Sequence, residues 1–205
     1  MAYVSSIGAP AKRIVVTGGP GAGKTAVLEV ARRDLCKHVE VLPESARIAF
    51  GGGFPRRHDD AGRRGAQRAI FHLQDELECM GPESETTATL LCDRGTLDGL
   101  AYWPGSWNEY FEDLGTTMQQ ELARYALVIH LRVPDTQSGY KNDLVRRESP
   151  HQATEIDNRL VEVWAGHPHR VFVDSSADFV RKAQRALAII RSSLACCASK
   201  DPRHG

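Results

Sequence analysis

The stretch IVVTGGPGAGKTAVLEVARRDL, from Ile14 to Leu35, contains two hydrophobic patterns separated by glycines. It begins with three β-branched apolar residues, which are typical of a strand buried on both faces. After Lys24, apolar side chains recur at the spacing of a helix face. The segment between them, Gly18-x-x-x-x-Gly23-Lys24-Thr25, therefore connects a predicted strand to a predicted helix.

This connecting segment has the chemistry of a phosphate-binding loop. Its glycines let the backbone curl so that several N–H groups point inward and surround an anion. The helix that follows offers its positive N-terminal end to the same anion. Lys24 can reach the β- and γ-phosphate oxygens, and the Thr25 hydroxyl can bind Mg²⁺. The alternative, an accidental glycine-rich turn, is disfavoured because the motif stands between a strand and a helix.

We therefore predict a nucleoside triphosphate site, with ATP as the expected ligand, GTP as a possible one, and Mg²⁺ beside it. The predicted contacts are Gly18, Gly19, Pro20, Gly21, Ala22, Gly23, Lys24, Thr25 and Ala26. The Asn-Lys-x-Asp signature of guanine-specific switch proteins is absent from the sequence, and YKND at Tyr140–Asp143 matches it only in part. This weakens a conventional GTPase interpretation without excluding GTP.

The composition narrows the classes of partner. Among 205 residues, the 26 Lys and Arg balance the 26 Asp and Glu, so there is no strong nucleic-acid signal. The five cysteines lack metal-ligand spacing. The N-terminal segment has no apolar signal sequence, and no segment approaches the length of a transmembrane span. We expect a cytoplasmic protein with one domain over residues 1–195 and a polar tail over residues 196–205.

Strand and helix patterns alternate along the chain. Further strands are predicted at His38–Glu44, Thr87–Cys92, Ala126–Pro134 and His169–Ser176. Helices are predicted at Gln67–Cys79, Leu97–Trp103, Thr117–Tyr125, His151–Trp164 and Asp178–Leu194. Such alternation favours an α/β fold with a parallel sheet covered on both faces. The Gly-rich segment Gly51–Gly65 is the least regular and is predicted to be a mobile loop.

Ligands of parallel sheets collect at the carboxyl ends of the strands, where several charged residues fall. Asp93 ends the apolar run TLLCD, as an aspartate that coordinates magnesium would. The next residue is Arg94, at a position where motor ATPases usually carry a glutamate. Arg94 can bind a substrate through its guanidinium or form a surface ion pair. Glu44 closes the second strand and is a candidate catalytic base, or merely a glutamate favoured by a helix N-terminus.

Two groups of arginines have less defined roles. Arg146 and Arg147 follow the fourth strand, where a lid near residues 135–150 could bring them onto a phosphoryl group in transfer. The alternative is a solvated basic pair. A second cluster comprises Arg56, Arg57, Arg63, Arg64 and Arg68. It could bind a phosphorylated substrate or an anionic lipid surface, but Asp59 and Asp60 within it make a solvated loop at least as plausible.

With these residues in place, the chain resembles a family of small P-loop kinase-like proteins often labelled AAA-domain ATP-binding proteins. The matching segments are VVTGGPGAGKT, VLPESAR, CDRGTLDGLAYW and DLVRRES. The family is related to the ribosylnicotinamide kinase domain of bacterial NAD regulators and to a GTP- and lipid-binding protein of photoreceptor channel trafficking. The resemblance implies a P-loop NTPase fold with strand order 2-3-1-4-5.

The resemblance also assigns roles to individual positions. It implies triphosphate binding at Gly18–Thr25, magnesium at Asp93, and lid contacts from Arg146 and Arg147. It places acceptor contacts at Glu44, Asp98 and Tyr102, and Arg94 joins them as a candidate substrate contact on its own chemistry. Our preferred hypothesis is a Mg²⁺-dependent kinase that transfers the γ-phosphoryl of ATP to a small, nucleoside-like acceptor. The alternatives are a nucleotide-dependent switch or adaptor and, less favoured, an AAA-type motor ATPase.

Overall fold

The fold is built around the strand that precedes the phosphate-binding loop. In the computed structural model, which describes residues 11–82, 87–133, 149–175 and 178–194, this strand is β1 (Lys12–Thr17). Its neighbours in an all-parallel sheet are β3 (Thr89–Asp93) and β4 (Leu127–Leu131), and the edges are β2 (Val39–Leu42) and β5 (Arg170–Val173). The order β2-β3-β1-β4-β5 confirms the prediction.

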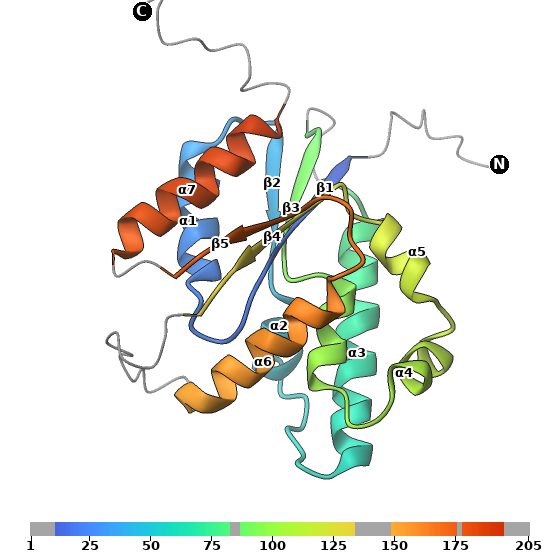
Figure 1. Cartoon of the computed structure of the whole chain (residues 1–205). Helices are drawn as coiled ribbons and strands as arrows, with labels where there is room; N and C mark the ends of the chain where they lie inside the picture. The colour runs from blue at the N-terminus through green and yellow to red at the C-terminus, as the bar shows by residue number, and fades with distance from the viewer. Residues whose placement is uncertain (1–10, 83–86, 134–148, 176–177, 195–205) are drawn as a thin grey trace, which may run out of the picture.

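Helices cover both faces of the sheet, as predicted (Figure 1). One face carries α1 (Lys24–Asp34) and α7 (Phe179–Ser192), which contact one another. The other face carries α3 (Asp60–Cys79), a 3₁₀ helix η1 (Thr96–Tyr102), α4 (Trp107–Leu114), α5 (Met118–Ala123) and α6 (Pro150–Val163). A short helix, α2 (Ser45–Gly51), follows β2. None of the described helices combines the length and hydropathy needed to cross a bilayer.

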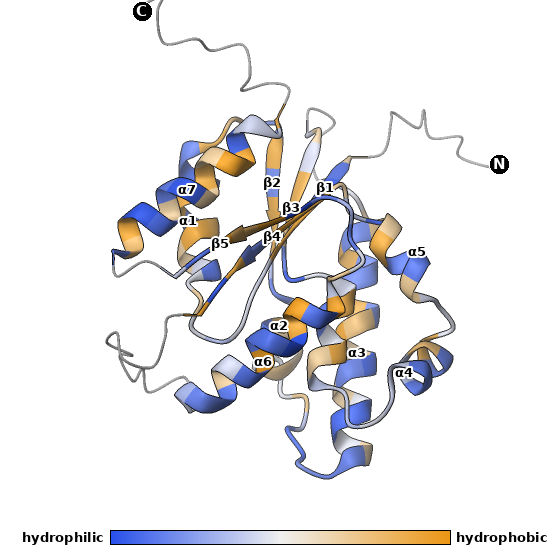
Figure 2. Cartoon of the chain, in the orientation of Figure 1, coloured by the Kyte–Doolittle hydropathy of each residue, from blue (hydrophilic) through white to orange (hydrophobic). Residues whose placement is uncertain are grey.

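Alternation along β1 divides the core into two layers. Ile14 and Val16 pack with residues of α1 and α7, whereas Val15 packs with Trp164 and other residues of the opposite layer. All three β1 side chains are fully buried. Figure 2 shows the central strands and the inward faces of these helices as predominantly hydrophobic. A strand buried on both faces is thus what the β-branched run predicts.

The segment predicted as a loop over Gly51–Gly65 is shorter than expected, because α3 begins at Asp60. The Asp59 side chain caps this helix by accepting a hydrogen bond from the Gly62 N–H, at 2.8 Å. The start of this helix was not predicted because its first turns contain two glycines, and glycine is unfavourable in helix interiors. The irregular connection is therefore confined to residues 52–59.

Ion pairs account for much of the arginine cluster in and after this segment. Arg64 pairs with Glu109 at 3.1 Å and Arg68 with Asp113 at 3.0 Å, which joins α3 to α4. The remaining contacts are Arg57 with Asp59, Arg63 with the Tyr102 carbonyl, and Arg56 over the Phe50 ring. These partners favour a structural and solvated role for the cluster and give no support to lipid binding.

Helices α2 and α4 were not predicted. For α4 the signals are present in the sequence: Ser106 and Glu109 form a reciprocal capping box, and Gly115 ends the helix with φ of 66°. For α2 they are absent, because Glu44 at its N-cap makes no side-chain cap bond and the helix has seven residues. The polar tail over residues 196–205 lies outside the described residues.

The first residue of the phosphate-binding loop tests the packing of this sheet. Gly18 has φ of 137°, and a Cβ there would lie 2.1 Å from the Leu131 carbonyl oxygen. Gly81 also has positive φ, 70°, but no atom lies within 4 Å of its imagined Cβ. We expect Gly81→Ala to lose about 1 kcal/mol of unfolding free energy, the cost of the left-handed backbone alone. Gly18→Ala should lose about 3 kcal/mol or more, since overpacking adds to that cost. Equal losses in urea unfolding would contradict this account.

Candidate functional site

The carboxyl ends of β1, β2 and β3 place four of the predicted charged residues in one cluster. Lys24 follows β1, Glu44 follows β2, and Asp93 and Arg94 end and follow β3. The Arg94 N–H donates to the Val16 carbonyl at 3.2 Å, which fixes the end of β3 against the start of the phosphate-binding loop. Residues far apart in sequence thus meet at the edge where parallel sheets bind ligands.

Lys24 lies under the loop rather than out in solvent. Its Nζ donates to the carbonyls of Gly18 at 2.7 Å and Gly19 at 3.0 Å, and the residue is only 7% exposed. Burial and the nearby Arg94 lower the pKa of Lys24 to about 8, although the carboxylates of Asp93 and Glu44 oppose this shift. An anion arriving at the loop would stabilise the charged ammonium, so the loop is prepared for a phosphate chain.

Asp93 has the properties of a ligand for a hard cation. The residue is 6% exposed, and its Oδ1 atom is buried without a hydrogen-bond partner among the described residues. Burial raises the pKa of Asp93 to about 6, against the effect of Lys24. A buried carboxylate oxygen without a donor fits Mg²⁺, which takes oxygen ligands. Thr25, at the exposed start of α1, is the second predicted ligand.

No group of three or more His, Cys, Asp or Glu side chains in the described part of the chain could hold a metal on its own.

Arg94 is held by two carboxylates. Its Nε donates to Glu44 Oε1 at 2.7 Å, and its Nη1 donates to Asp98 Oδ2 at 3.4 Å. Burial opposes its charge, but Tyr102, Glu44 and Asp98 raise the pKa of Arg94 well above its ordinary value. Of the described non-glycine residues, Arg94 alone has positive φ, 76°. Such backbone strain is concentrated at functional sites.

Glu44 occupies the helix N-terminus that the sequence offered as one alternative, and its role as a base stays a prediction. It is the N-cap residue of α2, and it forms an ion pair with Arg94. Burial acts to raise its pKa, but the charge and hydrogen bond of Arg94 outweigh this and lower the pKa of Glu44. The Arg94 ion pair, predicted as one possibility, is largely buried rather than on the surface, with side-chain exposures of 14% and 26%.

Asp98 and Tyr102 lie on η1, beside Arg94. Asp98 is buried, and its carboxylate accepts hydrogen bonds from Thr17 and Trp164 as well as from Arg94. The Tyr102 ring lies 5.8 Å from the Arg94 guanidinium carbon. Arg146 and Arg147 lie outside the described residues, as does most of the lid predicted near 135–150.

Three residues that support the loop have no sequence motif. Asp157 of α6 accepts a hydrogen bond from the Gly19 N–H at 2.9 Å. Lys182 of α7 donates to the Ala22 carbonyl at 2.9 Å, and Phe179 covers Gly23. Their partners are more than a hundred residues away in the chain, so no local pattern could reveal them.

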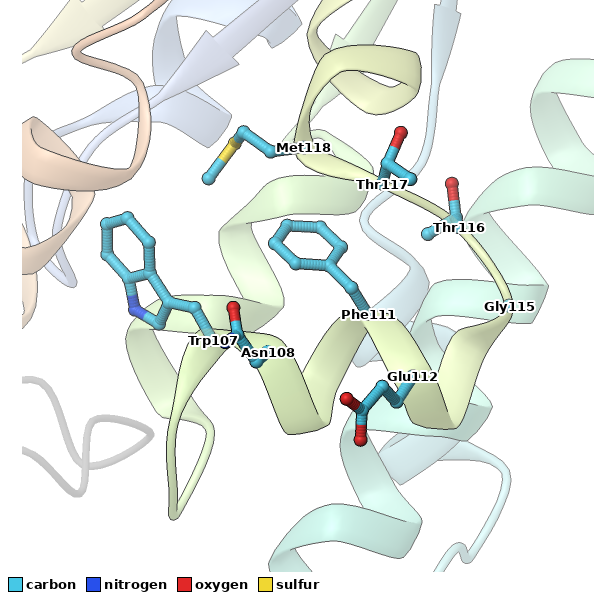
Figure 3. A pocket seen from close by; sticks show the side chains of 8 residues that line it. All are labelled: Trp107, Asn108, Phe111, Glu112, Gly115, Thr116, Thr117 and Met118. Atoms are coloured by element: carbon cyan, nitrogen blue, oxygen red, sulfur yellow. The ribbon is translucent and has the colours of Figure 1, made fainter.

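A large open cavity, of about 740 Å³, lies away from this cluster. It is formed by α4, α5 and the turn between them, with Trp107, Phe111 and Met118 around it (Figure 3). None of the residues predicted for phosphate, metal or acceptor lines this cavity.

The family model for an AAA domain matches residues 13–182, which include every element from β1 to the start of α7. The chain belongs to this family. A comparison with curated proteins finds no match.

Solved structures with a similar fold include NadR and several kinases. NadR in complex with NAD and AMP-PNP has a TM-score of 0.61 at 18% identity, with 88% of this chain and 49% of that chain covered. The chain thus spans about half the length of NadR. Thymidylate kinase from Candida albicans has a TM-score of 0.60 at 13% identity, covering 90% and 92%. Shikimate kinase from Acinetobacter baumannii, in complex with shikimate, has 0.52 at 18%, covering 90% and 96%. These likenesses show the P-loop kinase fold.

The raised pKa of Asp93 predicts an unusual pH dependence of stability. The pKa of Asp93 is about 6 in the folded protein, and that of an unfolded aspartate is about 4. The carboxyl group therefore binds its proton more tightly in the folded state. Its contribution to stability is present below pH 4 and is lost as the pH rises through 6. Two pKa units correspond to about 3 kcal/mol.

Asp93→Asn removes this penalty. Without nucleotide and in the presence of EDTA, its unfolding free energy relative to wild type should rise by about 2–3 kcal/mol between pH 4 and pH 7.5. Urea unfolding across this range measures the difference. A constant difference at all pH values would show that Asp93 is not held in a desolvated site.

Proposed function

We propose that the protein is a Mg²⁺-dependent phosphotransferase that passes the γ-phosphoryl group of ATP to a hydroxyl group of a small acceptor. The observation that carries this proposal is the meeting of Lys24, Asp93 and the Arg94–Glu44 pair at one sheet edge. Phosphoryl transfer depends chiefly on positioning and charge stabilisation, and these residues provide both.

The donor half of the site lies on β1, the loop and α1. The residues Gly18–Thr25, with Ala26 behind them, would surround the triphosphate with backbone N–H groups at the helix N-terminus. Lys24 would leave its carbonyl partners for the β- and γ-phosphate oxygens. Thr25 and Asp93 would hold Mg²⁺, which when bound supplies neutralisation of phosphate charge. The triphosphate interpretation leaves ATP or GTP as donor, with ATP preferred.

The acceptor half lies on α2 and η1, around Arg94. Arg94 is always charged and presents a planar set of donors, which suits an anionic or hydroxyl-bearing molecule. Arg94 lowers the pKa of Glu44 and so keeps its carboxylate charged, and we propose this carboxylate as the group that accepts a proton from the attacking hydroxyl. Tyr102 borders the same guanidinium and is the remaining proposed acceptor contact.

The acceptor is proposed to be nucleoside-like. Support comes from the fold shared with thymidylate kinase and NadR, of which another structure was solved with NR. The same fold in shikimate kinase shows that it also accommodates an acceptor of another kind. Arg146 and Arg147 are proposed to close over the phosphoryl group from a lid, which would exclude water from the transfer. We propose a cytoplasmic location on the sequence evidence alone.

The decisive experiment measures acceptor-dependent ADP release. A panel of nucleosides, ribosides and sugars is incubated with the protein, ATP and Mg²⁺, and stimulation above basal hydrolysis identifies the acceptor class. Slow hydrolysis that no acceptor stimulates, coupled to nucleotide-dependent partner binding, would indicate a switch protein instead. A nucleotide-dependent change of oligomeric state would indicate a motor ATPase.

Lys24→Ala tests the donor half. We expect triphosphate binding, measured by calorimetry, to weaken by at least a hundredfold, while circular dichroism shows an unchanged fold. The fold should persist because Lys24 bonds only to loop carbonyls and carries a desolvation cost. Unchanged ATP affinity in the folded variant would refute the phosphate-loop assignment.

Glu44→Gln separates catalysis from structure. If Glu44 is the base, turnover should fall by roughly a hundredfold or more, with ATP affinity retained. Glu29→Gln, an exposed glutamate on α1 paired with Arg32, is the matched control and should keep full turnover. Near-normal turnover of Glu44→Gln would leave Glu44 only the roles of helix cap and Arg94 partner.

A further inference from the structure

Asp98 connects three elements of the site through one buried carboxylate. The residue is 3% exposed. The Thr17 hydroxyl lies 2.9 Å from Oδ1 and 2.8 Å from Oδ2, and the Trp164 indole N–H donates to Oδ1 at 2.7 Å. Arg94 Nη1 donates to Oδ2 at 3.4 Å. Both oxygens are thus occupied by donors from β1, from the C-cap of α6 and from the residue after β3.

This arrangement is poorly suited to contact with an acceptor. A carboxylate that is buried and already accepts from three donors offers little access to a further ligand. It is well suited to hold something else in place, since its own position is fixed by two neutral donors in the core. Buried, fully satisfied polar networks of this kind rigidify a local structure.

The group it holds is Arg94. The Arg94 backbone is in the left-handed region, with φ of 76°, so its side chain leaves β3 in an unusual direction. Glu44 accepts a hydrogen bond from Nε on one side, and Asp98 accepts one from Nη1 on the other. Two carboxylates on different nitrogens of a planar group define its orientation more fully than either could alone.

The same carboxylate ties Arg94 to the phosphate-binding loop. Thr17 is the last residue of β1 and directly precedes Gly18. Its hydroxyl joins Asp98, so the guanidinium and the start of the loop are each one hydrogen bond away from one carboxylate. The distance from the arginine to the loop is thereby set by side chains as well as by the sheet.

We propose that Asp98 is a positioning residue, which fixes the Arg94 guanidinium relative to the phosphate-binding loop and does not itself contact the acceptor. The proposal deepens the proposed function in one respect, because it takes Arg94 as the group that meets the acceptor. The geometric part concerns Arg94 alone and holds whichever reaction the site performs.

The geometric part is tested by NMR of arginine side chains, with the Arg94 Nε–Hε signal assigned by its loss in Arg94→Lys. In wild type this proton is buried and bonded to Glu44, so it should exchange slowly with solvent. In Asp98→Asn we expect exchange at least tenfold faster, because one of the two groups that hold the guanidinium loses its negative charge. An unchanged exchange rate and chemical shift in the folded variant would overturn the proposal.

Glu121→Gln is the matched control for general damage to η1. Glu121 is also 3% exposed, and it accepts hydrogen bonds from Thr96 and Thr116 hydroxyls at 2.6 Å each. It should lose stability as Asp98→Asn does but leave the Arg94 signal unchanged. If Asp98→Asn does not fold, Thr17→Val decides, because it removes one anchor of Asp98 with little change of shape. We expect about threefold faster Arg94 exchange in Thr17→Val, and no change would overturn the proposal.

The functional part is read from kinetics with an acceptor found in the ADP-release panel. Asp98→Asn should raise the acceptor KM at least tenfold while the KM for ATP stays within twofold, a split that a general loss of stability does not produce. An equal rise in both values would overturn the link to the acceptor. If no acceptor stimulates the wild-type protein, the proposed function fails, whereas the Arg94 exchange result still decides the role of Asp98.

Discussion

The hydrogen bond from the Arg94 N–H to the Val16 carbonyl is the point on which the site depends. It lies at the end of the pairing between β1 and β3, and the two segments continue through unusual backbone conformations, at Gly18 and at Arg94. Parallel pairing brings Val16 opposite Asp93, so the phosphate-binding loop and the acidic strand end emerge side by side. The strand order contributes as well, because β1 is the central strand and is paired with a strand on each side.

This arrangement places several charged side chains close together in a largely buried position. Lys24, Asp93 and Arg94 are each largely buried, and the pKa values of Lys24 and Asp93 shift toward their neutral forms. Arg94 is the exception, because two carboxylates stabilise its charge. Burying these charges lowers the free energy of unfolding. Binding of an anion and a cation at such a site would stabilise the charged forms, a common compromise between stability and function.

The strand order was predicted from the resemblance to the kinase-like family, and the residues proposed for the donor half are marked by local sequence patterns. The glycine-lysine motif, the β-branched strand and the apolar run ending at Asp93 are local signals, and each predicts its own element without reference to the others. The acceptor half was less predictable, because it consists of contacts between distant residues. That Glu44 and Asp98 share Arg94 follows from the direction in which the Arg94 side chain leaves β3, and a left-handed arginine has no sequence signature. Likewise, Asp157 reads as an ordinary polar residue of a helix until the fold brings Gly19 beside it.

Helix α6 contacts both proposed halves of the site and so fixes their positions relative to one another. Through Asp157 it accepts a hydrogen bond from the phosphate-binding loop, and through Trp164 it donates one to Asp98. The helix thus contacts the donor half directly and the acceptor half through the residue that holds Arg94. The proposed donor half combines backbone groups of the loop with the side chains of Lys24, Thr25 and Asp93, which β1 and β3 bring to one edge of the sheet. The proposed acceptor half consists of the side chains of Glu44, Arg94 and Tyr102, and Asp98 links Arg94 to Thr17 at the start of the loop. Because Asp98 bonds to Thr17 of β1, to Arg94 and to Trp164 at the end of α6, a substitution in the acceptor half that displaces Asp98 would also affect the start of the phosphate-binding loop.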